Sequence, residues 1–228
     1  KSYQLPTPPQ MHNKGNYIIS LSDFTKWLAQ QAEELEVEIY PGFSASEVLY
    51  DENNKVVGIA TCDMGRLKDG SEGPNFERGI ELRAKQTVFS EGCRGHLGKT
   101  LMEKFELNSN NSPQTYGIGI KELWEVTPEN SKPGSIMHTT GWPLDNETYG
   151  GSFLYHLDDN KISIGFVIGL DYKNPYLSPY LEFQRFKHHP AIKKLLEGGR
   201  RINYGARALN EGGVQSLPKL TFPGGMLV

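Results

Sequence analysis

The segment TYGIGIKELWEV (residues 115–126) carries the clearest indication of architecture in this sequence. Its β-branched and aromatic residues are typical of a β-strand. Three further segments of the same character follow it: IMHTTGW (136–142), TYGGSFLYHL (148–157) and KISIGFVIGL (161–170). Four successive strands of this kind predict an antiparallel sheet.

Strands and helices alternate in the residues before this sheet. A helix with Ser22 as its N-cap is predicted, because apolar residues recur there at helical spacing and would pack on a sheet. These apolar residues are Phe24, Trp27, Leu28 and Leu35. Strands are predicted at residues 17–19, 37–40, 44–50, 55–62, 80–83 and 86–90, and residues 64–76 are predicted to be a flexible excursion.

The segment SEGCRGHL (residues 90–97) is predicted to end the last of these strands and to start another helix. A strand followed by a glycine turn and a helix can form an anion-binding site, because the first N–H groups of the helix have no partner within the helix. Beyond the sheet, Ser178 and Pro179 fit the N-cap and first position of a helix that Pro190 would end or kink. Strands at 201–209 and 220–228 complete the predicted α/β (α+β) fold.

Composition narrows the classes of function. The 228 residues are 37% hydrophobic, enough for one large domain or two small ones. With 24 basic and 27 acidic residues, the net charge of −3 gives no electrostatic indication of nucleic-acid binding. Two cysteines, Cys62 and Cys93, are too few for a disulfide framework or a four-thiolate metal site. The longest apolar run, residues 162–170, is far shorter than the roughly 20 residues of a membrane-spanning helix.

The two ends of the sequence lead us to expect an internal piece of a longer protein. No targeting signal can be read in KSYQLPTPPQ, and the closing segment FPGGMLV looks like an interrupted strand.

Many segments, in this order, resemble the electron transfer flavoprotein-ubiquinone oxidoreductase family. They are GNYI (15–18), QAEELEVEIYPG (31–42), FERGIELRAK (76–85), SEGCRGHL (90–97), PQTYGIGIKELWEV (113–126), GWPLDNETYGGSFLYHL (141–157), GFVIGLDYKNPYLSP (165–179), EFQRFKHHP (182–190), YGARALNEGG (204–213) and PKLTFPGG (218–225). Glu36 departs from the family, which usually has glycine before the strand expected there.

The resemblance implies an FAD-dependent oxidoreductase fold with a parallel-sheet portion of the FAD domain and an antiparallel, ubiquinone-binding region. Residues 1–112 would form the central part of the FAD-binding domain, 113–200 the ubiquinone-binding domain, and 201–228 a return toward the FAD domain. The implied activity is transfer of electrons from reduced electron transfer flavoprotein to ubiquinone, giving ubiquinol. FAD is the implied cofactor here, and a 4Fe-4S cluster in the full-length protein would have its ligands outside this chain. Peripheral contact with the mitochondrial inner membrane (matrix face), or with a bacterial inner membrane, is also implied.

The resemblance places the ubiquinone head group against Gly150 and Gly151, with Tyr149 and Phe153 beside them. A flat ring can approach the main chain closely where no Cβ intrudes, and backbone N–H groups can then bond its carbonyl oxygens. The alternative from the sequence alone is that the two glycines form a β-bulge.

The resemblance also suggests FAD contacts at Glu91, Gly92 and Arg94, with Val48 offering its backbone to the adenine. Gly92 would admit a phosphate and Arg94 would neutralise it. The alternatives are a helix-starting turn with a solvated arginine and, for Val48, an ordinary core position. No catalytic side chain and no metal site are expected, because the cofactors carry the redox chemistry.

Two other functions stay open from the sequence. The chain could belong to a flavoenzyme that resembles geranylgeranyl reductases or aromatic hydroxylases, or it could act as a non-catalytic quinone-binding or lipid-binding module. The aromatic residues within 171–189 could border a membrane or a partner protein, or simply form a packed helix.

Overall fold

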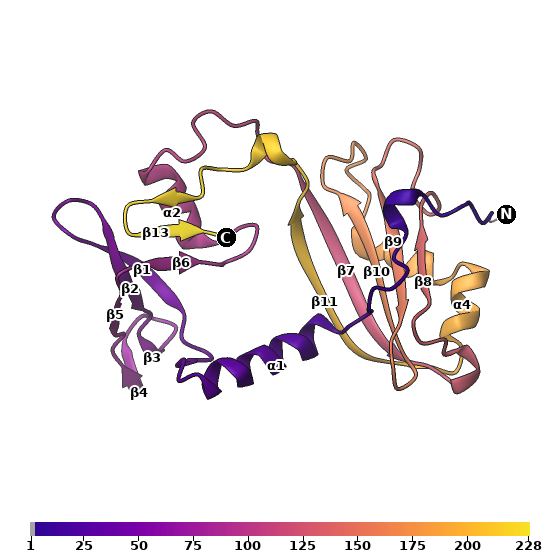
Figure 1. Ribbon diagram of the computed structural model, residues 1–228, viewed down its shortest axis with the longest axis horizontal. Coiled ribbons are helices and arrows are strands. Elements are labelled where there is room, and N and C mark those ends of the chain that lie inside the picture. Colours follow the sequence, from indigo (N-terminus) through magenta and orange to yellow (C-terminus); the bar gives the residue numbers. More distant parts are fainter. Residues whose placement is uncertain (1–2) are drawn as a thin grey trace.

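The computed structural model describes residues 3–228 as two lobes and a helix that lies apart from both (Figure 1). The helix, α1 (Leu21–Glu34), lies between the lobes in the view of Figure 1. Three short 3-10 helices, η1 (Pro9–Met11), η2 (Pro128–Asn130) and η3 (Val214–Ser216), lie in connections.

One lobe is built on a five-stranded antiparallel sheet, as predicted. Its strands, in the order β11-β7-β10-β9-β8, are β11 (Arg200–Asn210), β7 (Tyr116–Glu125), β10 (Lys161–Gly169), β9 (Gly150–His156) and β8 (Ile136–Thr139). β7 pairs with β10 without a register shift from Gly117 opposite Gly169 to Glu125 opposite Lys161. The four strands expected between residues 115 and 170 are therefore confirmed, and the strand expected at 201–209 pairs beside them.

Two helices, α3 (Pro179–Lys187) and α4 (Pro190–Leu196), cover one face of this sheet. Ser178 caps α3 through a hydrogen bond from the Leu181 N–H, as the sequence predicts, and Pro190 opens the next helix. Side chains alternate between faces along a strand, so every second residue of β10 points at the helices. The resulting core contains Ile162, Ile164, Phe166, Ile168, Phe183, Phe186, Ile192 and Leu196.

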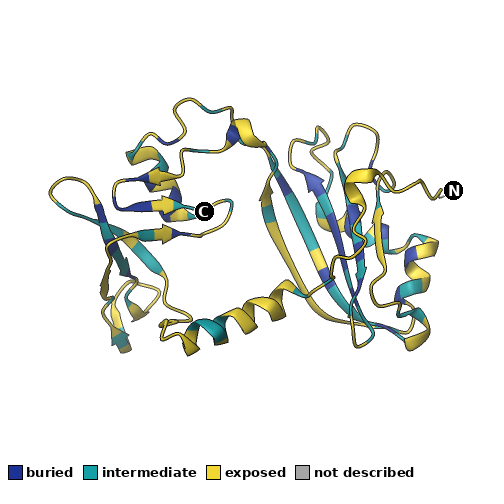
Figure 2. Cartoon of the chain, viewed as in Figure 1, coloured by how far each residue is buried: buried dark blue, intermediate teal, exposed yellow. Residues whose placement is uncertain are grey.

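The other lobe contains three small sheets, two of three strands and one of two, and helix α2 (His96–Lys104). β1 (Ala45–Tyr50) and β2 (Val56–Thr61) form the expected hairpin, with β5 (Glu81–Arg83) beside β2. β6 (Thr87–Phe89) pairs in parallel with β13 (Gly225–Leu227), which in turn pairs with β12 (Thr221–Phe222). This β6–β13 pair represents the parallel sheet expected in the first part of the chain. Figure 2 shows that buried residues gather in the two lobes and not between them.

Several local predictions for the N-terminal part were wrong. Residues 17–19 and 37–40 form no strand, because a strand needs a neighbour to pair its backbone groups and no described residue pairs with them in a sheet. Residues 64–76 are not a flexible excursion but the hairpin of β3 (Met64–Arg66) and β4 (Glu72–Glu77). Ser20, not Ser22, caps α1.

The apolar face of α1 is open among residues 3–228, against our expectation that it packs on a sheet. None of its residues is buried, and the Phe24 and Trp27 rings stack on each other while remaining 42% and 50% exposed. After the helix, Glu36 has φ 63°, a left-handed conformation that favours glycine. The position where the family usually has glycine therefore has the backbone geometry that glycine suits.

Strand β11 continues the antiparallel sheet to Asn210, beyond the boundary at residue 200 that we expected between domains. The chain returns to the first lobe only afterwards, through β12 and β13. A division of the chain into domains remains a proposal. Within residues 3–228, no helix has the length and apolar character needed to cross a membrane.

The buried His156 predicts a pH dependence of stability. Burial lowers its pKa below the ordinary value of 6.5, the nearby charge of Lys132 adds to this, and Nδ1 accepts the Lys132 N–H at 3.1 Å. A depressed pKa means that the stabilisation is present above pH 6.5 and is lost as the pH falls through the pKa of the folded state.

We expect a loss of at most about 1.4 kcal/mol per pH unit in this window. His156→Asn, which keeps an acceptor, should remove this part of the pH dependence in thermal melts recorded from pH 7.5 to 5; an unchanged slope would contradict the prediction.

Candidate functional site

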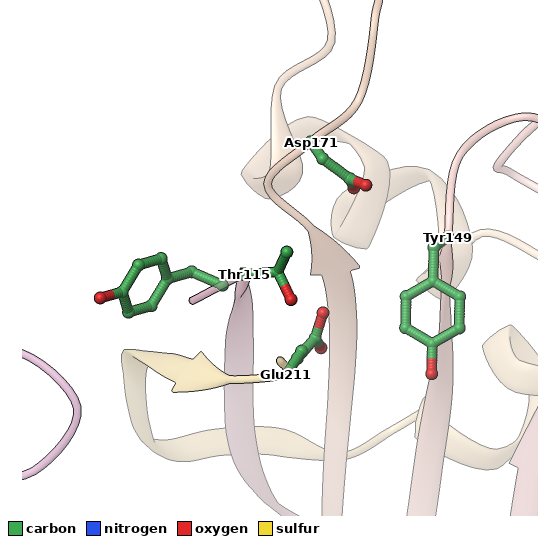
Figure 3. A pocket seen from close by; sticks show the side chains of 5 residues that line it. Thr115, Tyr149, Asp171 and Glu211 are labelled. Atoms are coloured by element: carbon green, nitrogen blue, oxygen red, sulfur yellow. The ribbon is translucent and has the colours of Figure 1, made fainter. Parts of the chain in front are cut away.

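Two cavities lie where the lobes meet, and among the described residues Tyr116 is the one that lines both. The first, about 200 Å³, is lined by Thr115, Tyr116, Tyr149, Asp171 and Glu211 (Figure 3). The second, about 180 Å³, is lined by Phe89, Glu91, Gly92, Cys93, Gly95, Gly98, Met102, Asn108, Gln114, Tyr116, Asn210, Ser216, Leu217, Pro218, Leu220, Leu227 and Val228. We call them the sheet-end cavity and the α2 cavity.

The sheet-end cavity forms because several strands begin or end at the same edge of the large sheet. Its two carboxylates, Asp171 and Glu211, come just after β10 and β11 and lie over Gly169 and Gly117, which are partners in the sheet. The Glu211 N–H donates to the Thr115 carbonyl at 2.9 Å and fixes this corner. In Figure 3 the Tyr149 ring and both carboxylates lie around the end of β10.

The first turn of α2 does not present a free anion site, which corrects our expectation for this segment. The Glu91 carboxylate accepts the Gly98 N–H at 2.6 Å and the Leu97 N–H at 3.4 Å, and it lies 3.4 Å from His96 Nδ1. A carboxylate of the chain itself thus meets the positive end of the helix.

Gly92 and Arg94 lie beside this cap. Gly92 has φ 78° and open space where a Cβ would be, so its backbone is accessible from the α2 cavity. Arg94 is exposed, and its guanidinium lies 5.5 Å from the centroid of the Tyr116 ring, so a contact with a phosphate stays a prediction. Cys93 Sγ donates to the Ala208 carbonyl at 3.1 Å, which ties this loop to β11.

Gly150 and Gly151 line neither cavity among the described residues. A Cβ on Gly150 would meet the Val167 carbonyl oxygen and, at 2.6 Å, Leu144 Cδ1; a Cβ on Gly151 would lie 2.6 Å from the Thr139 carbonyl oxygen. The space left by each missing side chain is therefore filled by the protein itself. The bulge alternative is wrong, because both glycines pair in register with β10, and a contact of their main chain with the quinone stays a prediction.

The other two expected quinone contacts differ in position. Tyr149 is 71% exposed and lines the sheet-end cavity. Phe153 lies farther along β9, where its ring stacks on Tyr155 and covers Gly165 of the neighbouring strand. The structure thus brings Tyr149 near Tyr116 but keeps Phe153 apart from the cavities.

Val48 lies on β1, opposite Ile59, and packs against the core of the first lobe. It lines neither cavity. Its side chain therefore has the core position that we considered as the alternative, and a backbone contact to a cofactor stays a prediction.

Sequence reasoning missed Thr115, Tyr116, Asp171 and Glu211 as possible site residues. They are 96 positions apart at the extremes, and only the pairing of β7 with β10 and β11 brings them together. The available signal was their position at strand ends, where polar residues follow the predicted strands at 170 and 210.

The described residues fit part of a flavin dinucleotide and not the whole molecule. Cofactor pockets commonly measure roughly 300–1,000 Å³, whereas the α2 cavity measures about 180 Å³. Its accessible Gly92 backbone suits a close approach, and the amides of Gln114, Asn108 and Asn210 can exchange hydrogen bonds with ribose or ring atoms.

Solved structures share this arrangement of elements. A geranylgeranyl bacteriochlorophyll reductase-like protein from Thermoplasma acidophilum has a TM-score of 0.64 at 19% identity over 90% of this chain and 45% of its own. Aklavinone-11 hydroxylase, solved in a ternary complex with FAD and aklavinone, has a TM-score of 0.56 at 11% identity over 92% of this chain and 36% of its own. The fold is that of FAD-dependent oxidoreductases.

Sequence comparison is more specific than the shared fold. Residues 116–209 match the family model described as "ETF-QO, ubiquinone-binding". Electron transfer flavoprotein-ubiquinone oxidoreductase of Homo sapiens, a mitochondrial protein, is 58% identical over 100% of this chain, and that of Pseudomonas aeruginosa is 57% identical over 97%. The chain spans 38% and 40% of the lengths of these two relatives. The resemblance to the electron transfer flavoprotein-ubiquinone oxidoreductase family is therefore confirmed along the chain.

Proposed function

We propose that this chain is the quinone-facing part of an enzyme that accepts electrons from reduced electron transfer flavoprotein and reduces ubiquinone to ubiquinol. The observation that carries the proposal is the match of residues 116–209 to a ubiquinone-binding family model. Those residues coincide with the five-stranded sheet and its helices, which run from Tyr116 to Asn210. The match thus falls on one complete structural unit.

The chain's part in the reaction would be to hold the two redox partners near each other. FAD, when bound, would supply the electrons that pass to the quinone. Gly92, Arg94 and the amides of the α2 cavity would hold one edge of the flavin, with Glu91 keeping the loop folded onto α2. Tyr149 would meet the quinone from the sheet-end cavity, and Gly150 and Gly151 could contribute only main-chain groups.

Further parts of the proposal come from the resemblance. They are a 4Fe-4S cluster in the full-length protein, electron transfer flavoprotein as the partner, and peripheral contact with an inner membrane, on its matrix face in a mitochondrion. The relatives are named as mitochondrial proteins in eukaryotes, and one is bacterial, which supports a respiratory setting.

The alternative functions have less support. The reductase-like and hydroxylase structures share 19% and 11% identity with the chain, a likeness of fold alone. A non-catalytic module would bind quinone without flavin, and no feature of the cavities favours that over a flavin-dependent reaction.

The full-length protein provides the test. We expect it to purify with bound flavin, to lose flavin absorbance when reduced electron transfer flavoprotein is added, and to regain it when ubiquinone-1 follows. Flavin that is reduced by the partner but is not reoxidised by the quinone would refute the proposed acceptor. A colourless protein that still binds quinone would favour the module.

A further inference from the structure

The large sheet has one face covered by α3 and α4 and one on which no α-helix packs within residues 3–228. On the covered face, the even-numbered residues 162–168 of β10 lie in the core with both helices. Side chains alternate between faces along a strand, so the odd-numbered positions Gly165, Val167 and Gly169 point the other way. We call their side the open face.

The sheet-end cavity lies on the open face. A Cβ on Gly169 would meet Tyr149 Cδ1 at 3.4 Å and Asp171 Oδ1 at 3.0 Å. A Cβ on Gly117, the partner of Gly169 in the sheet, would meet the Glu211 carboxylate. Figure 3 shows these three side chains around the end of β10. Tyr149, the expected quinone contact that lines a cavity, therefore lies on the open face.

Aromatic side chains of β8 and β9 lie farther along the same face. A Cβ on Gly165 would collide with the Phe153 ring, so that ring lies on the open face. Phe153 stacks on Tyr155 with ring centroids 5.1 Å apart, and His138 meets Tyr155 edge-on at 5.7 Å. We call these three rings the aromatic strip. At about 3.3 Å per residue, Phe153 lies roughly 13 Å along the strand from Tyr149.

We propose that ubiquinone lies on the open face, with its head group at Tyr149 and its isoprenoid tail along Phe153 and Tyr155. This inference rests on the proposed function. The ubiquinone-binding family model matches residues 116–209, and within that unit the two helices leave one face of the sheet uncovered. A quinone ring needs polar neighbours and its tail an apolar surface. The cavity offers carboxylate and hydroxyl groups, and the aromatic strip offers the apolar surface.

Val167 connects the cavity to the aromatic strip. It lies on β10, two residues from the glycine under Tyr149 and two residues from the glycine under the Phe153 ring. Its partners in the sheet are Gly119 and Gly151, which add no side chain. A backbone carbonyl of β8 occupies the space at Gly151, so the tail passes over Val167.

Tyr204 offers a matched control on the other side of the sheet. It pairs with Glu122, which in turn pairs with Ile164 of the core, so its side chain has the orientation of the covered face. It is 72% exposed. Tyr204→Gln therefore removes an exposed ring from the same sheet without altering the open face.

The test uses the full-length enzyme with reduced electron transfer flavoprotein as donor. The acceptors are ubiquinone-1, whose tail is too short to reach Phe153, and ubiquinone-4, whose tail is long enough. For Phe153→Gln we expect kcat/KM for ubiquinone-4 relative to ubiquinone-1 to fall about tenfold, because the tail loses apolar contact. Phe153→Leu, which keeps an apolar side chain, and Tyr204→Gln should stay within about twofold of the wild-type ratio.

A second measurement locates the tail without relying on activity. A ubiquinone analogue with a photoreactive azide at the end of its tail should, on illumination with the wild-type enzyme, label peptides of β8 or β9. A label on α3 and α4, or outside the sheet, would mean that the tail lies elsewhere and that another part of the polypeptide covers the open face.

The remaining outcomes also decide the question. An unchanged ratio in Phe153→Gln, or an equal fall in Tyr204→Gln, overturns the inference. A Phe153→Leu variant that falls as far as Phe153→Gln overturns it too, because the lost quantity would then be the stack of rings and not apolar surface. If Phe153→Gln does not fold, Tyr155→Gln is measured by the same ratio. A wild-type enzyme that holds flavin but reduces neither quinone would refute the proposed function, and the position of the azide label would still test this inference.

Discussion

Replacing Gly150 by alanine is expected to lower the melting temperature of the protein by about 5–10 °C, corresponding to roughly 2–4 kcal/mol. Gly150 lies where β9 meets β10, and a Cβ there would collide with the Val167 carbonyl and lie 2.6 Å from Leu144 Cδ1 and 3.3 Å from Ile168 Cα. Two of these atoms are backbone of a central strand, which cannot move without disturbing its pairing with β7 as well. Overpacking at such a position is relieved only by shifting strands.

Gly205→Ala is the matched control for this prediction. Gly205 also lies in a strand of the large sheet, but no atom comes within 4 Å of the position that its Cβ would take. Alanine should be neutral or stabilising there by about 0.5–1 kcal/mol, because it reduces the freedom of the unfolded chain. Thermal melts of both variants decide the question: similar melting temperatures would show that β9 and β10 are not tightly packed at Gly150.

This result bears on how the quinone site is studied. At each glycine of the pair, other atoms of the protein occupy the position that a Cβ would take, and a contact of the main chain with a flat ring stays a prediction. Loss of quinone reduction in a Gly150 or Gly151 variant would therefore reflect damage to the sheet as well as any lost ligand contact. Tyr149, which lines a cavity, is the more direct probe.

The large sheet could be predicted from the sequence because its information is local. Each strand from Tyr116 to Gly169 has its own apolar run, and β8, β9 and β10 each pair with a neighbour in sequence. Ser178 and Pro179 likewise define a helix start by themselves. The α1 helix was predicted on the same kind of evidence, but none of its residues is buried within residues 3–228.

The candidate site could not be predicted in the same way, because its residues meet only through long-range pairing. Asp171 and Glu211 each follow a strand and look like ordinary loop residues until Gly117 is placed opposite Gly169. Glu91 looked like part of a phosphate-binding turn, since the sequence does not show that its side chain folds back onto α2. A self-capping side chain and an accessible turn have the same sequence signature.

The other large expected effect concerns the stability of the protein when Lys187, the ion-pair partner of the buried Glu122, is replaced. Lys187 Nζ on α3 donates to both Glu122 carboxylate oxygens at 2.9 and 2.8 Å, and their side chains are only 12% and 3% exposed. Trp124 Nε1 and Arg201 Nη1 donate to the same carboxylate at 2.7 and 3.2 Å. The pair therefore attaches α3 to β7 within the core.

We expect Lys187→Met to destabilise the protein by roughly 3–5 kcal/mol, because a buried carboxylate loses its main partner. Glu122→Leu combined with Lys187→Met should recover most of that loss, since two apolar side chains then replace the ion pair. Thermal melts of the single and double variants measure the difference. A double variant no more stable than Lys187→Met alone would contradict the account.

The same pair predicts the direction of a pH effect. Burial by itself would raise the pKa of Glu122, but hydrogen bonds from Lys187 and Trp124 and the charge of Lys187 outweigh it, so the pKa lies below its ordinary value of 4.5. The stabilisation from a carboxylate with a depressed pKa is present above pH 4.5 and is lost as the pH falls through the pKa of the folded state. The difference in melting temperature between wild type and Lys187→Met should thus be full at pH 7 and shrink below pH 4.5. Lys187 Nζ also lies 5.0 and 5.5 Å from the ring centroids of Phe183 and Trp124. A difference in melting temperature that stays constant down to pH 3 would mean that Lys187 stabilises α3 by packing on these rings and not by its ion pair with Glu122.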